Sequence, residues 1–294
     1  DVPFFEHKAQ RNVVVEALKA AIESSTALRE EQTQFNLIAC PGYPELIGEM
    51  ITLNYDRGLT AFVIGDTPAR LTSDATSLNA WGMNLRLALE DNDKGAASYD
   101  EYMAMFYPWG FTSDNFGNNV VVPPSHMMLR TIALSDNVSY PWFAPAGFNR
   151  AALDFVTNVS VRLNVSDRDR LYDSRINPIA TFPQTGVCVW GQKTLQRKPT
   201  ALDRVNVRRL LINLKRYVRV VAESLLFEQN TLTTRNNFVS QVNPYMESVQ
   251  QRQGLYAFQV IMDDTNNTPD VVDRNQLVGT IYLQPTKTAE FIQL

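Results

Sequence analysis

Apolar positions along the first 140 residues switch between the spacing of helices and that of buried strands. From Arg11 to Ser25, Val14, Leu18 and Ile22 recur on one stripe, which predicts an amphipathic helix. Continuous apolar runs predict strands at 35–40, 59–64 and 102–107, and helical spacing predicts further helices at 44–57, 74–89 and 125–134.

This alternation of strands and helices predicts the fold of the first half. Strands that are apolar throughout are typical of sheets buried on both faces. Such a sheet needs a layer of helices on each side. We therefore expect residues 1–138 to form an α/β domain with a helix-sheet-helix layering.

A domain boundary is expected after residue 138. The segment SYPWFAPAG at 139–147 is rich in proline and aromatic residues and has no helical period. Beyond it, Ser166 is expected to begin a short helix with Asp169 as its capping-box partner. The later pattern predicts a strand at 187–190, helices at 203–227 and 235–250, and strands at 255–262, 277–283 and 289–294. Residues 139–294 are thus expected to form an α+β domain.

The helix at 203–227 is expected to be the longest in the chain and to carry most of a basic segment. Residues 193–219 hold nine basic residues and one acid, which leaves 18 of the chain's 27 basic and 30 of its 31 acidic residues elsewhere. A solvated face, a nucleic-acid contact and docking onto an acidic protein surface are the open interpretations, although an acidic chain disfavours nucleic acid. The apolar seam of this helix comprises Leu211, Leu214, Val218, Val221 and Leu225.

The composition indicates a globular protein. Hydrophobic residues make up 45% of the chain, and no apolar run approaches the ~20 residues that span a bilayer. The first ten residues lack the basic start and apolar stretch of a secretory signal. Cys40 and Cys188 lie in apolar runs and are expected to be buried free thiols, because a disulfide framework needs more cysteines.

Candidate catalytic chemistry is sparse. His7 and His126 are the two histidines, and neither has another histidine or a cysteine at metal-ligand spacing. The chain contains no G-x-S-x-G elbow, and WGQKT at 190–194 lacks the glycines of a phosphate-binding loop. The oxygen-rich segment 263–273 is interpreted as a turn, with calcium binding as the weaker alternative. We assign no catalytic, cofactor-binding or metal-ligating residue, and interpret His126 as a structural side chain.

Five segments of the second half resemble, in order and approximate spacing, the pattern of phage contractile tail sheath proteins. They are NVSYPWFAPAGFNR at 137–150, DRDRLYDSRINPI at 167–179, GVCVWGQKTL at 186–195, DRVNVRRLL at 203–211 and TNNTPDVVDRNQLVGTIYLQP at 265–285. The first half resembles the family more weakly, through FNLIACPG at 35–42 and IGDTPAR at 64–70.

The resemblance implies a structural protein rather than an enzyme. Its first domain would be the sheath α/β domain, called subtilisin-like but non-catalytic, and 139–294 the sheath C-terminal domain with the strand-exchange sheet. Sheath subunits polymerise helically around a tail tube and contract, which drives the tube through the host envelope. One alternative is a sheath subunit of a phage-tail-like bacteriocin or secretion machine, which would work by the same mechanism. The alternative from a different functional class is an α/β hydrolase-type enzyme.

The resemblance also implies partners and a location. The partners would be further copies of the chain, the tail tube protein, and the baseplate and tail terminator proteins, without a cofactor, nucleic acid or membrane insertion. The protein would belong to the virion after assembly in the host bacterial cytoplasm. Family members are longer, so we interpret this chain as a core fragment or as the ordered part of a longer protein.

Two interfaces are expected on this basis. A tail-tube interface would use basic residues of the helix at 203–227, namely Arg208, Arg209, Lys215, Arg216 and Arg219. The strand-exchange interface would use Leu277, Val278, Thr280, Ile281, Tyr282, Leu283, Phe291 and Ile292. Unpaired edges of this kind need a partner or a cover.

Overall fold

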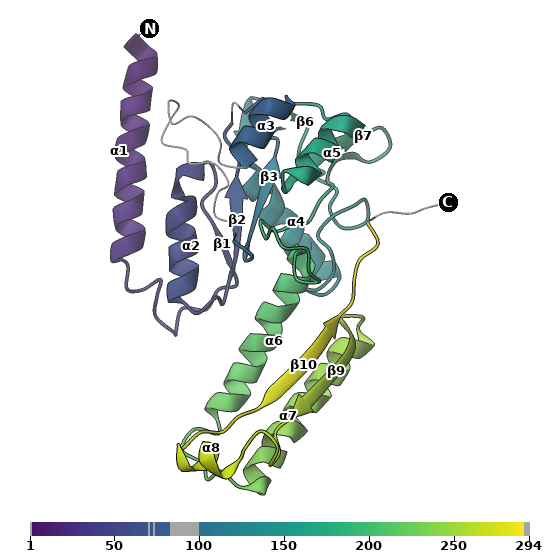
Figure 1. The fold of residues 1–294 in the computed structure, drawn as a ribbon. Coiled ribbons are helices and arrows are strands. Elements are labelled where there is room, and N and C mark those ends of the chain that lie inside the picture. The colour runs from purple at the N-terminus through teal and green to yellow at the C-terminus, as the bar shows by residue number, and fades with distance from the viewer. Residues whose placement is uncertain (1, 70, 73, 83–99, 291–294) are drawn as a thin grey trace. The chain divides into compact units, whose positions relative to one another are not determined.

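The fold is described from a computed structural model, which covers all residues except 1, 70, 73, 83–99 and 291–294 (Figure 1). The chain divides into two compact units, Asp1–Arg209 and Leu210–Leu294. The predicted boundary after residue 138 does not separate these units, because two strands beyond it complete the sheet of the first unit. The roles expected for the two sheath domains remain predictions.

A five-stranded sheet forms the centre of the first unit. Its order is β1-β2-β3-β7-β8, in which the first three pairs are parallel and β8 runs antiparallel to β7. The strands are β1 (Leu37–Ala39), β2 (Phe62–Asp66), β3 (Met103–Tyr107), β7 (Ile176–Phe182) and β8 (Gly186–Val189). The three strands predicted in the first half are thus confirmed as β1, β2 and β3.

Helices cover both faces of this sheet. Alternate side chains of β3, such as Met103 and Met105, belong to one buried cluster with residues of α2 (Ile47–Asp56), α3 (Ala75–Gly82) and α5 (Val165–Asp173). On the other face α4 (Pro124–Val138) packs against β2 and β3, with Met127 and Met128 fully buried. The predicted helix-sheet-helix layering is confirmed.

The first unit also contains elements outside these layers. The helix α1 (Val2–Ser24) packs against α2, and a 3-10 turn at Pro44–Leu46 precedes α2. A separate antiparallel sheet has the order β5-β4-β6, formed by β4 (Gly110–Ser113), β5 (Asn119–Val122) and β6 (Asn158–Val159). The sequence pattern does not reveal these strands, since they have two to four residues each.

Two local predictions are corrected in the first unit. The capping box of α5 is formed by Asn164 and Asp167 rather than by Ser166 and Asp169, because the N-cap residue lies two positions earlier than predicted. Both thiols are free, as predicted, but only Cys188 is buried, and Cys40 is half-buried.

The second unit contains two helices and a two-stranded ribbon. The helix α6 (Val205–Glu223) crosses the boundary between the units and is followed by α7 (Leu232–Gln251), β9 (Leu255–Ile261), α8 (Pro269–Asp273) and β10 (Thr280–Pro285). The strands pair antiparallel, and α7 packs against β9. The strand predicted at 289–294 is not formed at 289–290, and its other residues lie outside the described part of the chain.

The apolar seam predicted for α6 is present, although the helix is shorter than expected. Leu214 and Val221 are buried, and Leu211 and Val218 are half-buried, while Leu225 lies beyond the end of the helix. The helix ends at Glu223, and a turn follows in which Phe227 takes a positive φ of 68°. Among the described helices the longest is α1, with 23 residues against 19 in α6, so the prediction that this helix is the longest is wrong. Among the described helices, none combines the length and the apolarity that crossing a membrane requires.

Candidate assembly interfaces

The β9–β10 ribbon, formed by β9 and β10, has one polar and one apolar face. Tyr282 lies opposite Gln259, and both side chains are exposed. On the other face Leu283 lies opposite Phe258, and both are half-buried. A ribbon of two strands is marginally stable in water, so its packing on the apolar side of α7 holds it in place.

Contacts at both ends of β10 show which way its backbone groups point. Before the strand, the side-chain amide of Asn267 pairs with the N–H and the C=O of Val278, at 2.8 Å each. After the strand, the N–H of Thr286 donates to the C=O of Gly254, which directly precedes β9, at 3.2 Å. Alternate residues of an extended strand direct their backbone groups to the same side. The even-numbered residues of β10 therefore face β9.

Odd-numbered residues form the outer edge of β10. Gly279, Ile281 and Leu283 direct their N–H and C=O groups away from β9, and Pro285 offers a carbonyl alone. Within the part of the chain that the structure describes, no third strand pairs with this edge. An edge of this kind can accept an added strand.

Four of the residues predicted for strand exchange lie in β10, but they differ in direction. Ile281 and Leu283 present their backbone groups at the outer edge, whereas Thr280 and Tyr282 direct theirs to β9. The sequence pattern places all four in one strand, and the two sides become distinct only through the register with β9.

The other predicted strand-exchange residues lie outside the ribbon. Leu277 and Val278 precede β10, and the N–H and C=O groups of Val278 are hydrogen-bonded to the side chain of Asn267. Phe291 and Ile292 fall outside the described residues.

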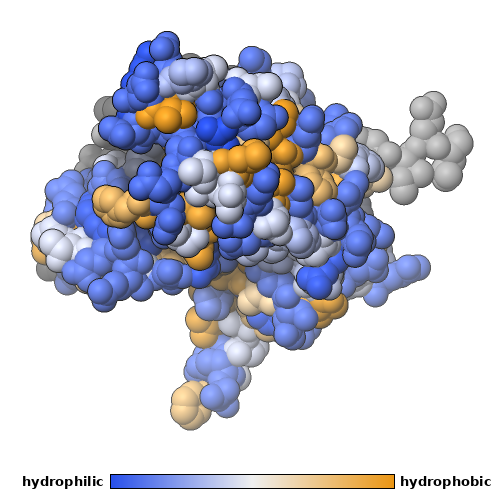
Figure 2. Space-filling view, turned by 90° about the horizontal axis from the view of Figure 1, so that it is seen from below, coloured by the Kyte–Doolittle hydropathy of each residue, from blue (hydrophilic) through white to orange (hydrophobic). Residues whose placement is uncertain are grey.

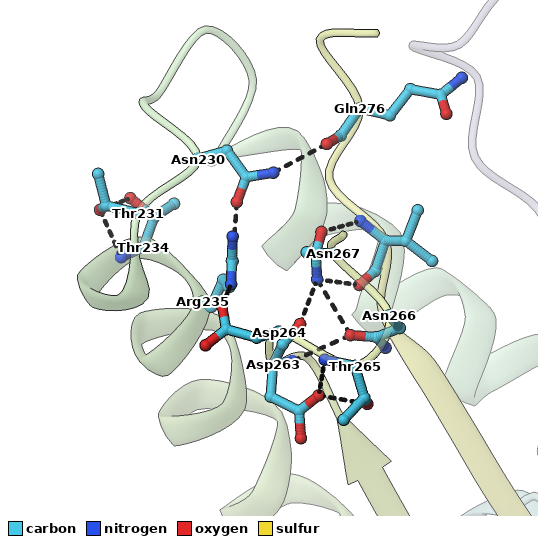
Figure 3. A network of polar contacts seen from close by, with 11 residues as sticks. Asn230, Thr231, Thr234, Arg235, Asp263, Asp264, Thr265, Asn266, Asn267 and Gln276 are labelled. Carbon is cyan, nitrogen blue, oxygen red and sulfur yellow. Dashed lines mark hydrogen bonds and ion pairs between the residues drawn. The ribbon is translucent and has the colours of Figure 1, made fainter. Parts of the chain in front are cut away.

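A polar network fixes the segment that joins β9 to β10 (Figure 3). The carboxylate of Asp263 accepts from the backbone and the hydroxyl of Thr265, which lowers its pKa. The side-chain amide of Asn266 donates to the C=O of Ile261 at 2.8 Å, and Asn267 donates to the C=O of Asp263 at 3.0 Å. The oxygen-rich segment is therefore a hydrogen-bonded turn, which then enters α8.

The same network ties this segment to α7. Arg235 is 5% exposed, and its guanidinium contacts both Asp264 and Asn230 (Figure 3). The Asn230 amide in turn donates to the C=O of Gln276 at 2.9 Å. The Arg235 guanidinium and the Asn230 amide thus hold the start of α7 to the segment between β9 and β10.

Two of the five arginines and lysines predicted to face a tail tube are buried in their own unit. Arg208 is 4% exposed, and it pairs with Glu101 at 2.6 Å and with Gln196 at 2.8 Å. Arg209 is 3% exposed and pairs with Asp136. The prediction is wrong for these two residues, because the first turns of α6 lie inside the first unit.

The other three basic residues predicted for the tube lie on an exposed part of α6. Lys215, Arg216 and Arg219 are all exposed. Between them, Tyr217 stacks on Tyr245 of α7 with ring centroids 3.8 Å apart. This contact anchors α6 on α7 and leaves a basic patch, defined by the three exposed residues, on the outside.

A buried carboxylate lies at the carboxyl end of β2. Asp66 is 2% exposed, and it accepts from the N–H and the hydroxyl of Ser125 at 2.6 and 2.8 Å and from the N–H of Gly42 at 2.7 Å. Burial raises its pKa, although these hydrogen bonds act in the opposite direction. Asp66 thereby satisfies a free N–H at the start of α4.

This cluster is not arranged as a Ser-His-Asp triad. The hydroxyl of Ser125 donates directly to the Asp66 carboxylate, whereas in such a triad a histidine lies between the serine and the aspartate. His126 is exposed, and its ring packs edge-on against Phe155 with centroids 6.4 Å apart. The geometry therefore fits the interpretation of His126 as a structural side chain.

Comparison with known proteins finds similarity to sheath proteins. Residues 197–294 match the family described as phage tail sheath C-terminal domain. Over 162 residues the chain is 42% identical to the tail sheath protein of Vibrio phage KVP40 and 38% identical to that of Enterobacteria phage T4. These alignments cover 55% of this chain, and 24% and 25% of the two relatives. The chain thus spans about a quarter of their length.

Solved structures of contractile machines share the fold. A chain of the anti-feeding prophage baseplate in the contracted state has a TM-score of 0.77 at 24% identity, covering 94% of this chain and 75% of that one. A chain of the PVC sheath complex, from an extracellular contractile injection system in the contracted state, has a TM-score of 0.75 at 23% identity, covering 94% and 73%. The predicted resemblance to contractile tail sheath proteins is confirmed.

Proposed function

We propose that this chain is the inner part of the sheath subunit of a contractile phage tail. The observation that carries the proposal is the open outer edge of β10, which lies inside the segment that matches the sheath C-terminal domain. The sequence relatives are tail sheath proteins, and the fold relatives include chains of sheath and baseplate complexes. The role is mechanical, and no catalytic step belongs to it.

Strand addition accounts for assembly at this edge. An extended segment of another copy pairs with the N–H and C=O groups of Gly279, Ile281 and Leu283. Main-chain hydrogen bonds of this kind tolerate rotation of the rigid units better than side-chain docking does. The added strand and the strand β10 move together, so their hydrogen bonds persist. Head-to-tail contacts that do not close produce an open helix of subunits. Contraction then requires two arrangements of the inter-subunit contacts with different free energies.

The basic patch on α6 is the surface proposed to face the tail tube. Each exposed charge pair contributes only ~0.2–1 kcal/mol, so many subunits together align the sheath on the tube while single contacts remain easy to release. Charge reversal with Lys215→Glu and Arg219→Glu in the full-length protein should make assembly around purified tubes fail or become sensitive to salt. Normal coating of tubes at physiological salt by this double variant would exclude the patch as the tube contact.

Further partners and the location follow from the same proposal. The sheath would contact baseplate and tail terminator proteins at its two ends. It would be assembled in the host bacterial cytoplasm and carried in the virion. The fold relatives from the anti-feeding prophage and the extracellular injection system favour, as a second candidate, a sheath of such a phage-tail-like machine.

Microscopy of the full-length protein tests the proposal. Expressed without other tail proteins, it should form hollow tubes or sheath-like polymers that are visible by negative staining. The variant Ile281→Pro removes one N–H from the outer edge and leaves the pairing with β9 intact. It should stay folded and lose the polymers, while Ile281→Val, which keeps the N–H, should still form them. A folded protein that stays monomeric at all concentrations would contradict the proposal.

A further inference from the structure

Three aromatic rings form a partly exposed cluster on the first unit, here named the aromatic patch. They belong to Phe148, Phe182 and Trp190, and their centroids lie 4.6 to 5.0 Å apart. Phe148 is 46% exposed and Trp190 is 40% exposed. Figure 2 shows that, on the face seen there, hydrophobic residues form separate patches between hydrophilic ones. Localised apolar surface of this kind marks interaction sites.

The backbone holds Phe148 beside the end of β8. The N–H of Gly147 donates to the C=O of Val189 at 2.9 Å, and the N–H of Val189 donates to the C=O of Ala151 at 3.1 Å. These bonds lay the segment around Phe148 along β8, next to Trp190, which directly follows the strand. The patch is therefore fixed by main-chain pairing and is not a mobile loop tip.

Small residues below the rings explain part of the arrangement. Ala180 lies opposite Cys188 in the β7–β8 pair, and both are fully buried. Phe182 lies two residues after Ala180, and Trp190 lies two residues after Cys188. Because side chains alternate along a strand, both rings are on the same face of the sheet as these small residues. From these positions the rings, which pack on one another, can cover the two small side chains. Covering the sheet requires only the inner faces of the rings. It does not explain why the outer faces are exposed to solvent.

One arginine guanidinium lies against the patch, and a second arginine is close to it in the sequence. The guanidinium of Arg168 lies 5.2 Å from the ring centroid of Phe182, and the side chain is half-buried. Arg150, two residues after Phe148, donates to the C=O of Ala144 at 3.2 Å. Among the described residues, no carboxylate lies within ion-pair distance of either guanidinium.

We propose that the aromatic patch is a docking surface for an apolar segment with a carboxylate, supplied by a second copy of this chain. The patch is apolar and carries the Arg168 guanidinium at one of its rings, whereas the chain outside residues 193–219 has 30 acidic and 18 basic residues, so a second copy offers carboxylates that can pair with it. The carboxylate pairs with Arg168 in the fork geometry that guanidinium groups favour, and apolar side chains cover Phe148 and Trp190. This inference rests on the proposed assembly of the chain and adds a second contact to it.

Hydroxyl-radical footprinting of the full-length protein tests the inference. Oxidation of Phe148 and Trp190 is compared between assembled particles and free subunits. Both residues should be oxidised in free subunits and protected several-fold after assembly. If particles form and both residues remain equally reactive, the patch is a cover for the sheet and the inference is wrong. Protection already present in free subunits would assign the patch to a segment of the same chain and overturn it as well.

Charge variants provide the matched comparison. Arg168→Glu should raise the concentration needed for assembly several-fold, Arg168→Lys should restore part of the loss, and Arg162→Glu, an exposed arginine of the same unit, should have no effect. Unchanged urea midpoints establish that the subunits stay folded. Equal assembly of Arg168→Glu and Arg162→Glu would refute the docking role. Failure of the unmodified protein to assemble would instead remove the proposed function, and this inference with it.

Discussion

Arg209 and Asp136 form a paired contact within the first unit that removes one predicted tube-facing residue from the surface. Arg209 donates two hydrogen bonds to the Asp136 carboxylate, one of them 2.9 Å long, from a side chain that is 3% exposed. The Asp136 side chain is 29% exposed, so water screens the pair from one side only. The pair joins the start of α6 to the end of α4.

Replacing Asp136 by alanine should destabilise the first unit. The variant leaves a buried guanidinium without its carboxylate, which costs about 2–3 kcal/mol after allowance for the partial exposure of Asp136. Urea unfolding followed by circular dichroism measures this loss. Arg219→Ala is the control, because its side chain is exposed, and it should change stability by no more than about 0.5 kcal/mol. Equal losses in the two variants would mean that the pair does not stabilise the fold.

Asp66 should make the stability of the first unit depend on pH. Burial raises its pKa in the folded state, so the folded protein holds this proton more tightly than the unfolded chain does. The corresponding stabilisation is complete below the unfolded pKa of about 3.9 and is lost as the pH rises through the folded value. Wild type should therefore gain stability relative to Asp66→Asn as the pH falls. Urea unfolding of both proteins across this range measures the difference, and a gap that shrinks toward acid pH would contradict the assignment.

The two thiols should differ in reactivity. Burial raises the pKa of Cys188 to about 11, and its side chain is inaccessible, whereas Cys40 is half-buried. Because the thiolate is the reactive form, a disulfide reagent at pH 8 should label Cys40 first and Cys188 only on unfolding. Labelling followed by peptide mass spectrometry distinguishes the two sites. Rapid labelling of Cys188 in the folded protein would show that the rings above it open.

Asn267→Ala should loosen the ribbon end without unfolding the second unit. Asn267 is 3% exposed, and its amide supplies the hydrogen bonds for both backbone groups of Val278. The loss of these hydrogen bonds should lower the free energy of opening the ribbon end by about 1–3 kcal/mol. Amide exchange at the start of β10 should accelerate in this variant and stay unchanged in Gln276→Ala, whose side chain is exposed and takes no part in the network. Unchanged exchange in both variants would assign the network no role in holding β10.

The sequence pattern predicts most elements because their apolar residues report burial directly. The runs that become β2 and β3 are predominantly apolar, and both strands are buried along their whole length. The strand β7 is not predicted from the sequence pattern, because it contains Pro178, a residue that normally argues against a central strand. Its inclusion in the first sheet also moves the boundary of the unit beyond residue 138.

The candidate interfaces were predictable in position but not in detail. A basic helix can be recognised from spacing, yet the burial of Arg208 depends on Glu101, more than a hundred residues away in the chain. The outer edge of β10 likewise depends on the pairing with β9 and on the contact between Asn267 and Val278. The aromatic patch brings together Phe148 and Trp190, which are far apart in the chain, and no local pattern indicates this contact.

The most direct test of the proposed function is the density beside β10 in a high-resolution cryo-electron microscopy map of the assembled full-length protein. We predict that an extended segment of a neighbouring subunit lies along the outer edge and hydrogen-bonds with the N–H and C=O groups of Ile281 and Leu283. An edge that faces solvent in the assembly, or one covered by the same subunit's own chain, would contradict the account.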